Sequence, residues 1–142
     1  MSTAPHRDPR FLALVAGGGA LGTLARYGTA QLVPGAGHWP LATLAVNLVG
    51  SFLLGLLLEA VARRGPEDAR RTALRLGLGT GFCGGFTTFS SLAVEVDGLL
   101  RDGVAATALA YGAGSVVAGL LAALAGVAVA GARQSHHRGR PA

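Results

Sequence analysis

The stretch GFCGGFTTFS, residues 81–90, decides how the chain is interpreted, because it interrupts a long apolar segment. It places glycines, two threonines and a serine around Phe86 and Phe89. A glycine inside a helix costs about 1 kcal/mol relative to alanine, so we expect the helix to break here. Irregular backbone at membrane depth is tolerated only where it is buried in protein or lines a cavity. The stretch therefore predicts main-chain N–H and C=O groups that lack helical hydrogen bonds and need other partners in the protein.

The composition around this stretch is typical of a protein in a lipid bilayer. Of the 142 residues, 51% are hydrophobic and 13% are charged, and 23 are glycine. Abundant glycine with few aromatic residues suits close packing of helices in lipid. Cys83 is the single cysteine, which excludes an internal disulfide and a multi-cysteine metal site. We expect an all-α integral membrane protein.

Four apolar segments are long enough to cross a hydrocarbon core, which needs about 20 helical residues each. They cover residues 11–33, 40–62, 72–100 and 104–132, and the third contains the expected break. Short connections make successive helices antiparallel, so both termini lie on one side of the membrane. The sequence predicts one four-helix transmembrane domain over residues 1–142.

The basic residues, all twelve of them arginine, are divided unevenly between the two sides of this bundle. Only Arg26 and Arg101 fall on the side away from the termini. By the positive-inside rule both termini then lie in the cytoplasm. A net charge of +5 can indicate nucleic-acid binding, but these arginines flank apolar runs, so we expect no nucleic-acid partner. The ten on the terminal side are Arg7, Arg10, Arg63, Arg64, Arg70, Arg71, Arg75, Arg133, Arg138 and Arg140.

The C-terminal tail HHRGRPA, residues 136–142, is interpreted as a solvated end or one that touches lipid headgroups. Metal binding by its paired histidines is the less favoured alternative.

Polar residues inside the expected spans carry information, because they are costly at mid-bilayer. Thr43, Asn47 and Ser51 recur at every fourth position and so share one face of the second helix. That face lines either a partner helix or a water-accessible path, and the pattern alone leaves both open. Tyr111 and Ser115 form a similar face on the fourth helix, which Gly119 continues without a polar group.

Glycines at 18 and 22, and at 77, 81 and 85, have the spacing of tightly packed helix faces. Two acidic residues lie near the spans. Glu59 sits beside Arg63 and Arg64, where a surface role is expected, and Glu95 is interpreted as marking the approach to the membrane interface. Neither is a convincing mid-depth group for proton coupling.

The broken segment and its phenylalanines suggest ion chemistry. Unwound main-chain carbonyls are natural ligands for a monovalent cation. Phe86 and Phe89, at i and i+3, are expected to project on one side just after the break, where core packing is the usual explanation. Alternatively their ring edges, which carry partial positive charge, face an anion. Together with Asn47 and the hydroxyls, such a site suits a small, strongly hydrated anion.

Three stretches together resemble the Fluc/CrcB family of fluoride channels. They are GGGALGTLARY (17–27), LATLAVNLVGSFLLG (41–55) and GFCGGFTTFSSLAVEV (81–96), in the family's usual order and spacing. The resemblance covers all four expected spans. It implies a passive channel, and not an enzyme, that exports cytoplasmic fluoride and so reduces fluoride toxicity.

The resemblance also implies roles for single residues. Fluoride would meet Asn47 and Thr43 on the second helix, the rings of Phe86 and Phe89, and Tyr111 and Ser115 on the fourth. A structural sodium ion would be held by the main-chain carbonyls of Gly84 and Thr87. Arg26 matches a vestibule or structural charge, and Glu95 matches an acidic position whose role stays open.

The family's assembly is an antiparallel, dual-topology dimer with two pores and the sodium at its centre. The chain would accordingly be a multi-pass protein of the cell membrane in contact with lipids. Its arginine bias of ten to two is unusual for a chain that inserts both ways. The sequence leaves open a homodimer or a heterodimer with an oppositely oriented paralogue.

Rival functions fit the sequence less well. A small multidrug transporter needs a carboxylate in the first span, and residues 11–33 contain no Asp or Glu. A membrane scaffold would explain the glycine faces. It would explain neither the polar ladder, as we call the aligned Thr43, Asn47 and Ser51, nor the glycine-rich break. An enzyme is disfavoured because Ser90, Ser91 and Cys83 have no histidine in any expected span to act as a base.

Overall fold

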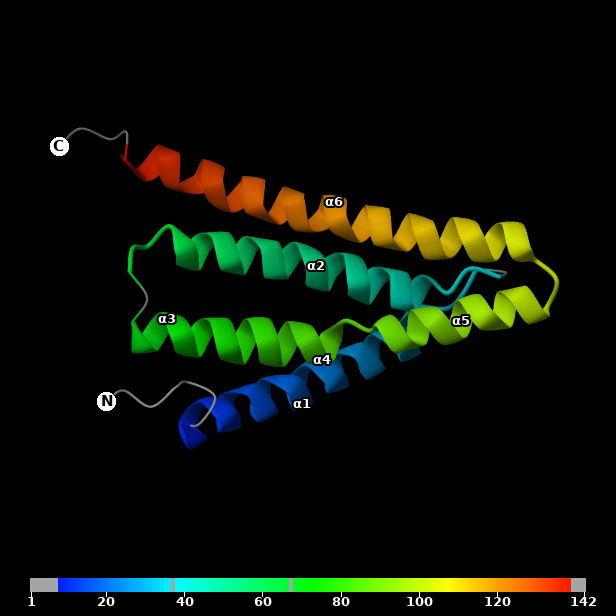
Figure 1. Ribbon diagram of the computed structural model, residues 1–142, viewed down its shortest axis with the longest axis horizontal. Coiled ribbons are helices and arrows are strands. Elements are labelled where there is room, and N and C mark those ends of the chain that lie inside the picture. The colour runs from blue at the N-terminus through cyan, green and yellow to red at the C-terminus, as the bar shows by residue number, and fades with distance from the viewer. Residues whose placement is uncertain (1–7, 37, 67, 139–142) are drawn as a thin grey trace.

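The computed structural model describes residues 8–36, 38–66 and 68–138, with side chains up to residue 132. Within these residues the secondary structure is helical, apart from an isolated bridge between Ala36 and Trp39. The helices run roughly along one common axis (Figure 1). The helical class predicted from the sequence is confirmed.

Three long helices coincide closely with predicted spans. Helix α1 covers Pro9–Leu32, α2 covers Leu41–Ala62, and α6 covers Ala105–Arg138. Asp8 caps α1 by accepting a hydrogen bond from the backbone N–H of Arg10 at 2.9 Å. The start of α1, the end of α6 and the connection from α2 to α3 lie at the same end of the bundle (Figure 1).

The third segment is divided into several pieces. Helix α3 covers Ala69–Leu74, the π-helical stretch η2 covers Arg75–Cys83, α4 covers Gly84–Phe86 and α5 covers Phe89–Arg101. Between α4 and α5, Thr87 and Thr88 are extended, with ψ angles of 159° and 123°.

The interruption therefore lies at two threonines and not at the glycines of GFCGG. Gly81 and Gly85 stay helical because α1 packs directly against them, at Val15 and Gly19. Thr88 leaves the helix because its hydroxyl caps α5, accepting from the N–H of Ser91 at 3.1 Å.

Helices α2 and α6 are long and apolar enough to cross a membrane. Leu41–Ala62 and Ala105–Ala132 both reach a mean hydropathy of 2.2. Only 17% of each apolar window is buried inside the chain, unlike the core helix of a soluble protein. The fold is thus consistent with a helical membrane protein. The four-span arrangement stays a prediction, because α1 and the divided third segment do not meet the same test.

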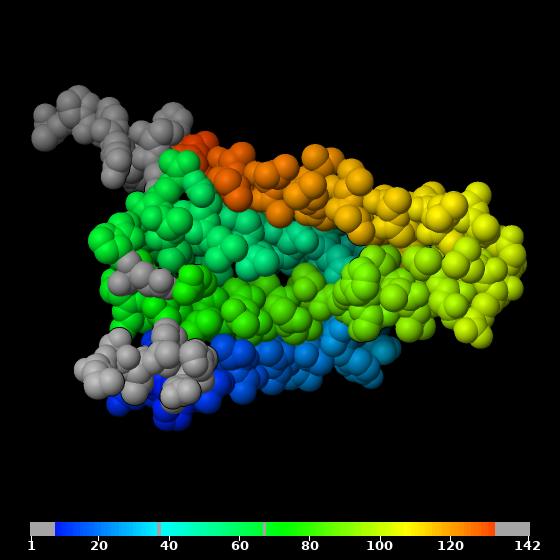
Figure 2. Space-filling model, in the orientation of Figure 1, coloured from blue at the N-terminus to red at the C-terminus, as the bar shows by residue number. Residues whose placement is uncertain are grey.

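Glycine allows the helix backbones to approach each other. A Cβ at Gly22 of α1 would collide with the carbonyl of Phe82, and one at Gly55 of α2 would collide with the carbonyl of Ala123 on α6. Gly18 meets Gly77 in the same way. The prediction that these glycine faces pack tightly is confirmed. In the space-filling view α2 is enclosed between α6 and the third segment (Figure 2).

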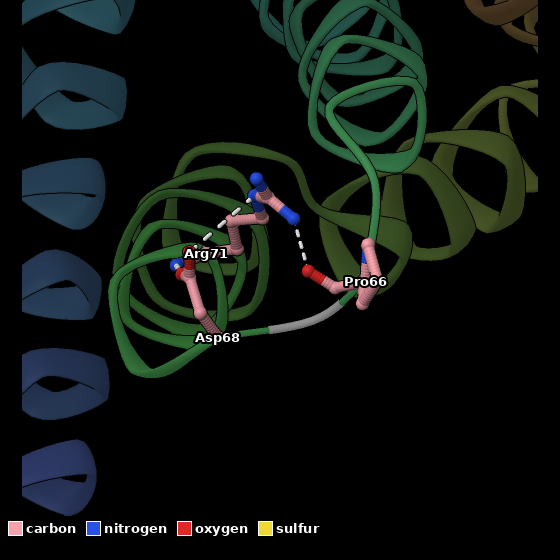
Figure 3. Close-up of polar contacts among 3 residues, drawn as sticks. All are labelled: Pro66, Asp68 and Arg71. Atoms are coloured by element: carbon pink, nitrogen blue, oxygen red, sulfur yellow. Dashed lines mark hydrogen bonds and ion pairs between the residues drawn. The ribbon is translucent and has the colours of Figure 1, made fainter.

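A short connection joins α2 to α3 and is fixed by its own polar groups (Figure 3). Asp68 caps α3, accepting from the N–H of Arg71 at 2.8 Å. The Arg71 guanidinium folds back, donating to the carbonyl of Pro66 and placing Nε 3.7 Å from the Asp68 carboxylate. Gly65 has a φ of +98°, which suits glycine at this turn.

Candidate functional site

The interruption of the third segment is held by Asn47 in the middle of α2. Its Nδ2 donates to the carbonyl of Thr88 at 2.9 Å, and its Oδ1 accepts from the Thr88 N–H at 2.8 Å. These two backbone groups have left the helix and need partners, because Thr88 is buried. The structure thus gives Asn47 the helix-joining role that the sequence left open. The amide carries a second N–H beyond these two bonds.

The last regular helical bond before the interruption ends at the carbonyl of Cys83, and the carbonyl of Gly84 is released from the helical pattern. Thr87 donates both its N–H and its hydroxyl to the carbonyl of Cys83, each at 2.9 Å. The N–H of Thr88 is committed to Asn47, so it does not make the regular helical bond to the carbonyl of Gly84. A Cβ at Gly84 would meet nothing within 4 Å, so open space lies beside this residue.

Glu95 of α5 joins three helices. Its Oε1 accepts from the hydroxyl of Thr43 on α2, and its Oε2 accepts from the hydroxyl of Tyr111 on α6, both at 2.6 Å. Thr43 and Tyr111 are buried, and the ring of Trp39 packs edge-on against Tyr111 at 6.2 Å between centroids. Glu95 is half-buried and bonded across the bundle, so it has a structural role in addition to its predicted position near the membrane interface, which stays a prediction.

The sequence leaves the role of Glu95 open, between a vestibule charge and a structural one, although a signal for these contacts exists. Ser91 and Glu95 are four residues apart, which places them on one face of α5, directly after the Thr88 cap. The partners Thr43 and Tyr111 lie in distant parts of the sequence, so the spacing alone does not identify them.

Ser115 of α6 is the unusual polar residue of the described chain. It is only 6% exposed, and its hydroxyl has no hydrogen-bond partner among the described residues. Buried polar groups almost always have a partner, so an exception indicates that water, an ion or another molecule supplies it. Ser115 lines a cleft of about 390 Å³ that we call the α2–α6 cleft.

The α2–α6 cleft is lined by Asn47 and Ser51, two of the three residues of the polar ladder predicted on the second helix. Its polar lining comes from the interruption and from both flanking helices: Asn47, Ser51, Thr87, Thr88 and Ser115. Gly119 also lines it, and a Cβ there would lie 3.6 Å from the hydroxyl of Ser51. The Ser51 hydroxyl of α2 therefore lies beside Gly119, where α6 has no polar side chain of its own.

The two predicted phenylalanines occupy different environments. Phe86 ends α4, is 8% exposed and stacks on Phe82 with centroids 5.7 Å apart. Phe89 begins α5, is 77% exposed and lines the α2–α6 cleft. The extended residues lie between the two rings, so the expected helical i, i+3 relation, with both just after the break, does not apply.

Arg26 of α1 lies on a second cleft, of about 370 Å³, that we call the α1 cleft. Hydroxyls face it from three elements, including Thr23 of α1, Thr43 of α2 and Ser91 of α5. Thr88 lines both clefts, so the interruption separates them. Six of the predicted site residues line the two clefts: Asn47, Thr87, Phe89 and Ser115 the α2–α6 cleft, and Arg26 and Thr43 the α1 cleft. Four line neither cleft: Gly84, Phe86, Glu95 and Tyr111. The histidines of the C-terminal tail lie outside the residues whose side chains the structure describes.

Comparisons with known proteins agree with the resemblance. A family model described as CrcB-like protein, Camphor Resistance (CrcB), matches residues 13–127. The chain is similar to fluoride-specific ion channel FluC 2 of Leifsonia xyli subsp. xyli, with 42% identity over 127 residues, 89% of this chain and 88% of that protein. It is 48% identical to fluoride-specific ion channel FluC of Thermus thermophilus over 125 residues, 87% of this chain and 96% of the relative.

A third relative has the same name. Fluoride-specific ion channel FluC of Chlorobaculum tepidum is 47% identical over 121 residues, 82% of this chain and 91% of that protein. The matches extend across the helices that build both clefts. The chain belongs to the CrcB-like family.

Proposed function

We propose that the chain is a fluoride-selective passive channel that exports cytoplasmic fluoride and so reduces fluoride toxicity. Its relatives are named fluoride-specific ion channels. The observation that carries the proposal is the buried Ser115 hydroxyl, which has no partner among the described residues and lines the α2–α6 cleft. A donor kept without an acceptor in a protein interior is suited to a passing anion.

The chemistry of the α2–α6 cleft suits fluoride. This ion is small and strongly hydrated, so a pore must replace its water with hydrogen-bond donors. Ser51 and Ser115 supply hydroxyls, Asn47 retains an amide N–H, and Phe89 offers a ring edge. The lining contains no fixed positive charge that would bind the ion too tightly to release it. Phe86 contributes to the path indirectly, because its packing on Phe82 supports the backbone next to the interruption.

Thr43 and Tyr111 would act together with Glu95. Each hydroxyl has one proton and donates it to the Glu95 carboxylate. Each can therefore donate to fluoride only when Glu95 releases it. We therefore assign Glu95 as the residue that positions the hydroxyls of Thr43 and Tyr111. Arg26 supplies the positive charge of the α1 cleft, which would be the vestibule of the channel.

The assembly proposed with this function is an antiparallel dimer with two pores, each lined by both subunits, and the exposed surface leaves room for a second subunit. Phe89 is 77% exposed although it lines the cleft, so a single chain leaves that wall open. Large apolar side chains of α5 and α6 are also exposed, among them Val94, Leu109 and Leu120. The second subunit is either an identical copy or an oppositely oriented paralogue.

A structural sodium ion fits the interruption. The main-chain carbonyls of Gly84 and Thr87 are neutral oxygen donors, which suit a hard monovalent cation. The Gly84 carbonyl is released by the Asn47 contact to Thr88, and open space lies beside Gly84. Two antiparallel copies would bring four such carbonyls together. A cation there would offset part of the cost of bringing an anion into a low dielectric.

Passive export needs no energy-coupling site. Fluoride enters cells as neutral HF at acidic pH and dissociates in the neutral cytoplasm. The membrane potential then drives the anion outward through a multi-pass channel in the cell membrane.

Fluoride efflux from liposomes tests the proposal. The purified chain is reconstituted, the potential is clamped with a potassium ionophore, and released fluoride is followed with an ion-selective electrode. We expect rapid fluoride release and no chloride release over the same time, relative to protein-free liposomes. Equal release of both anions, or of neither, would contradict a fluoride channel formed by this chain alone. Addition of an oppositely oriented paralogue then separates a missing partner from a wrong function.

A further inference from the structure

Trp39 is the single tryptophan of the chain and lies in the connection from α1 to α2. This connection is at the end of the bundle where α6 begins (Figure 1). The ring of Trp39 meets the ring of Tyr111 on α6 at an angle of 87°, with the two centroids 6.2 Å apart. Perpendicular aromatic pairs attract each other beyond the apolar area that they bury, so this contact favours one orientation of the two rings.

The main chain holds Trp39 on both sides. Its N–H donates to the carbonyl of Ala36 at 3.1 Å, and its carbonyl accepts from the N–H groups of Ala36 at 3.3 Å and of Leu41 at 2.9 Å. Pro40 follows directly and has a φ of −78°, within the range that its ring fixes. The indole ring therefore projects from a backbone that has little freedom to move.

Tyr111 is the side chain that this contact orients. Its ring is 1% exposed and packs in a cluster with Leu92, Leu99 and Ala108. Trp39 is itself 42% exposed, so it forms an outer cover of the buried ring. The Tyr111 hydroxyl donates to Oε2 of Glu95 at 2.6 Å. A tilt of the Tyr111 ring would therefore move the hydroxyl away from the carboxylate.

A tryptophan beside a membrane-crossing helix also suits a second role, as an anchor in the headgroup region. The two roles depend on different parts of the indole. An anchor uses the polar N–H together with the apolar ring and needs no partner ring inside the protein. Orientation of Tyr111 needs an aromatic ring at position 39 and does not need the N–H. The perpendicular contact with a buried tyrosine favours the second requirement.

We propose that Trp39 is a positioning residue of the channel, which holds the Tyr111 ring so that its hydroxyl stays bonded to Glu95. The inference rests on the proposed function, in which this hydroxyl donates to fluoride when Glu95 releases it. Trp39 acts through Tyr111 and not on the ion itself.

A double-mutant cycle between Trp39→Leu and Tyr111→Phe tests this role. Trp39→Leu keeps an apolar side chain but removes the aromatic ring, and Tyr111→Phe keeps the ring but removes the hydroxyl. Trp39→Leu should slow fluoride efflux from liposomes about two- to tenfold, the rate equivalent of one perpendicular aromatic pair. In the Tyr111→Phe background it should cause no further loss, because the hydroxyl that it orients is gone. Equal losses in both backgrounds would overturn the inference.

Trp39→Phe separates the positioning role from a membrane anchor. This variant keeps an aromatic ring and lacks the indole N–H, so it should retain most of the efflux that Trp39→Leu loses. Efflux as slow in Trp39→Phe as in Trp39→Leu would overturn the positioning role in favour of an anchor. Leu32→Ala is the matched control, because it removes an 82% exposed apolar side chain at the end of α1, and it should leave efflux unchanged. An equal loss in Leu32→Ala would also overturn the inference.

Thermal unfolding of the same variants in detergent gives a readout that does not depend on conduction. Tyr111→Phe should lower the melting temperature of the unmodified chain more than that of Trp39→Leu, in which the hydroxyl is no longer held at Glu95. Equal shifts would overturn the positioning of Tyr111. If the unmodified chain releases no fluoride, the proposed channel is rejected, and the difference between these two shifts still decides whether Trp39 positions Tyr111.

Discussion

The side-chain amide of Asn47 and the main chain of Thr88 exchange two hydrogen bonds, of 2.9 and 2.8 Å, across the interruption of the third segment. One residue of α2 thus satisfies the donor and the acceptor that the broken helix leaves without partners. The same contact releases the Gly84 carbonyl. Asn47 therefore links the stability of the interruption to the proposed ion path.

Replacement of Asn47 should reduce both stability and fluoride flux. Asn47→Ala leaves two main-chain groups of buried Thr88 unpaired, so we expect the free energy of unfolding to fall by about 1–3 kcal/mol. We expect fluoride efflux to fall by about tenfold or more, which corresponds to about 1.4 kcal/mol of barrier. Chemical unfolding in detergent and liposome efflux measure the two effects.

Thr29→Val is the control for Asn47→Ala. The hydroxyl of Thr29 bonds only to the Ala25 carbonyl of its own helix, at 2.9 Å. Thr29→Val should leave the free energy of unfolding and the fluoride efflux nearly unchanged. Equal losses of stability and efflux in the two variants would show that a general loss of polar contacts is responsible, and not the loss of the two Asn47–Thr88 hydrogen bonds.

Replacement of Glu95 should destabilise the bundle. Glu95→Gln replaces one of the two acceptor oxygens with an NH2 donor, so the hydroxyl proton of either buried Thr43 or buried Tyr111 loses its acceptor, at a cost of about 1–3 kcal/mol. Glu95→Ala should cost more, because both hydroxyls are left unpaired. Asp97→Asn changes an exposed pair with Arg101 and should alter stability by less than about 1 kcal/mol. Thermal unfolding of the three variants checks this order, and equal melting temperatures would refute it.

The two phenylalanines should respond differently to truncation. Phe86→Ala empties a buried position against Phe82 and should cost about 3–5 kcal/mol. Phe89→Ala removes an exposed ring, so its stability loss should be smaller while fluoride efflux still falls. Unfolding and efflux are measured on both variants. Unchanged fluoride efflux in Phe89→Ala would contradict the proposal that the Phe89 ring contacts fluoride along the path.

The helix positions could be predicted from the sequence because each depends on a local apolar run and on nearby glycines. Family membership could also be predicted from three stretches, and the matching family model over residues 13–127 confirms it. Membership of this channel family likewise confirms that the chain is not an enzyme. The polar ladder of Thr43, Asn47 and Ser51 was visible for the same local reason, since it follows the helical period.

The details of the site depend on contacts between distant residues. The break is located by Asn47, which lies 41 residues before Thr88, and local glycine content alone predicted it a few residues too early. Glu95 gains its role from Thr43, 52 residues away, and Tyr111, 16 residues away. The sequence predicts Phe86 and Phe89 on one helical face because the helical period continues through Thr87 and Thr88, which the fold makes extended.

The arginine distribution predicts the orientation of the chain in the membrane. Ten arginines on the terminal side and two on the other should direct insertion mainly one way. Cysteines introduced at each terminus, with buried Cys83 replaced, should react with an impermeant reagent from one side only. Labelling from both sides with intact fluoride efflux would instead establish a dual-topology homodimer and defeat the paralogue hypothesis.

The most direct test of the proposed path is fluoride efflux by Ser115→Ala, measured beside its stability. The variant removes a buried hydroxyl that has no partner among the described residues, so stability should be unchanged or slightly higher. Thr107→Ala on the same helix is the control, because Thr107 lines neither cleft. We predict that Ser115→Ala folds normally and conducts fluoride about tenfold more slowly, as expected for the loss of one hydrogen bond of about 1.4 kcal/mol. Efflux equal to that of the unmodified chain would contradict the claim that this hydroxyl donates to fluoride in transit.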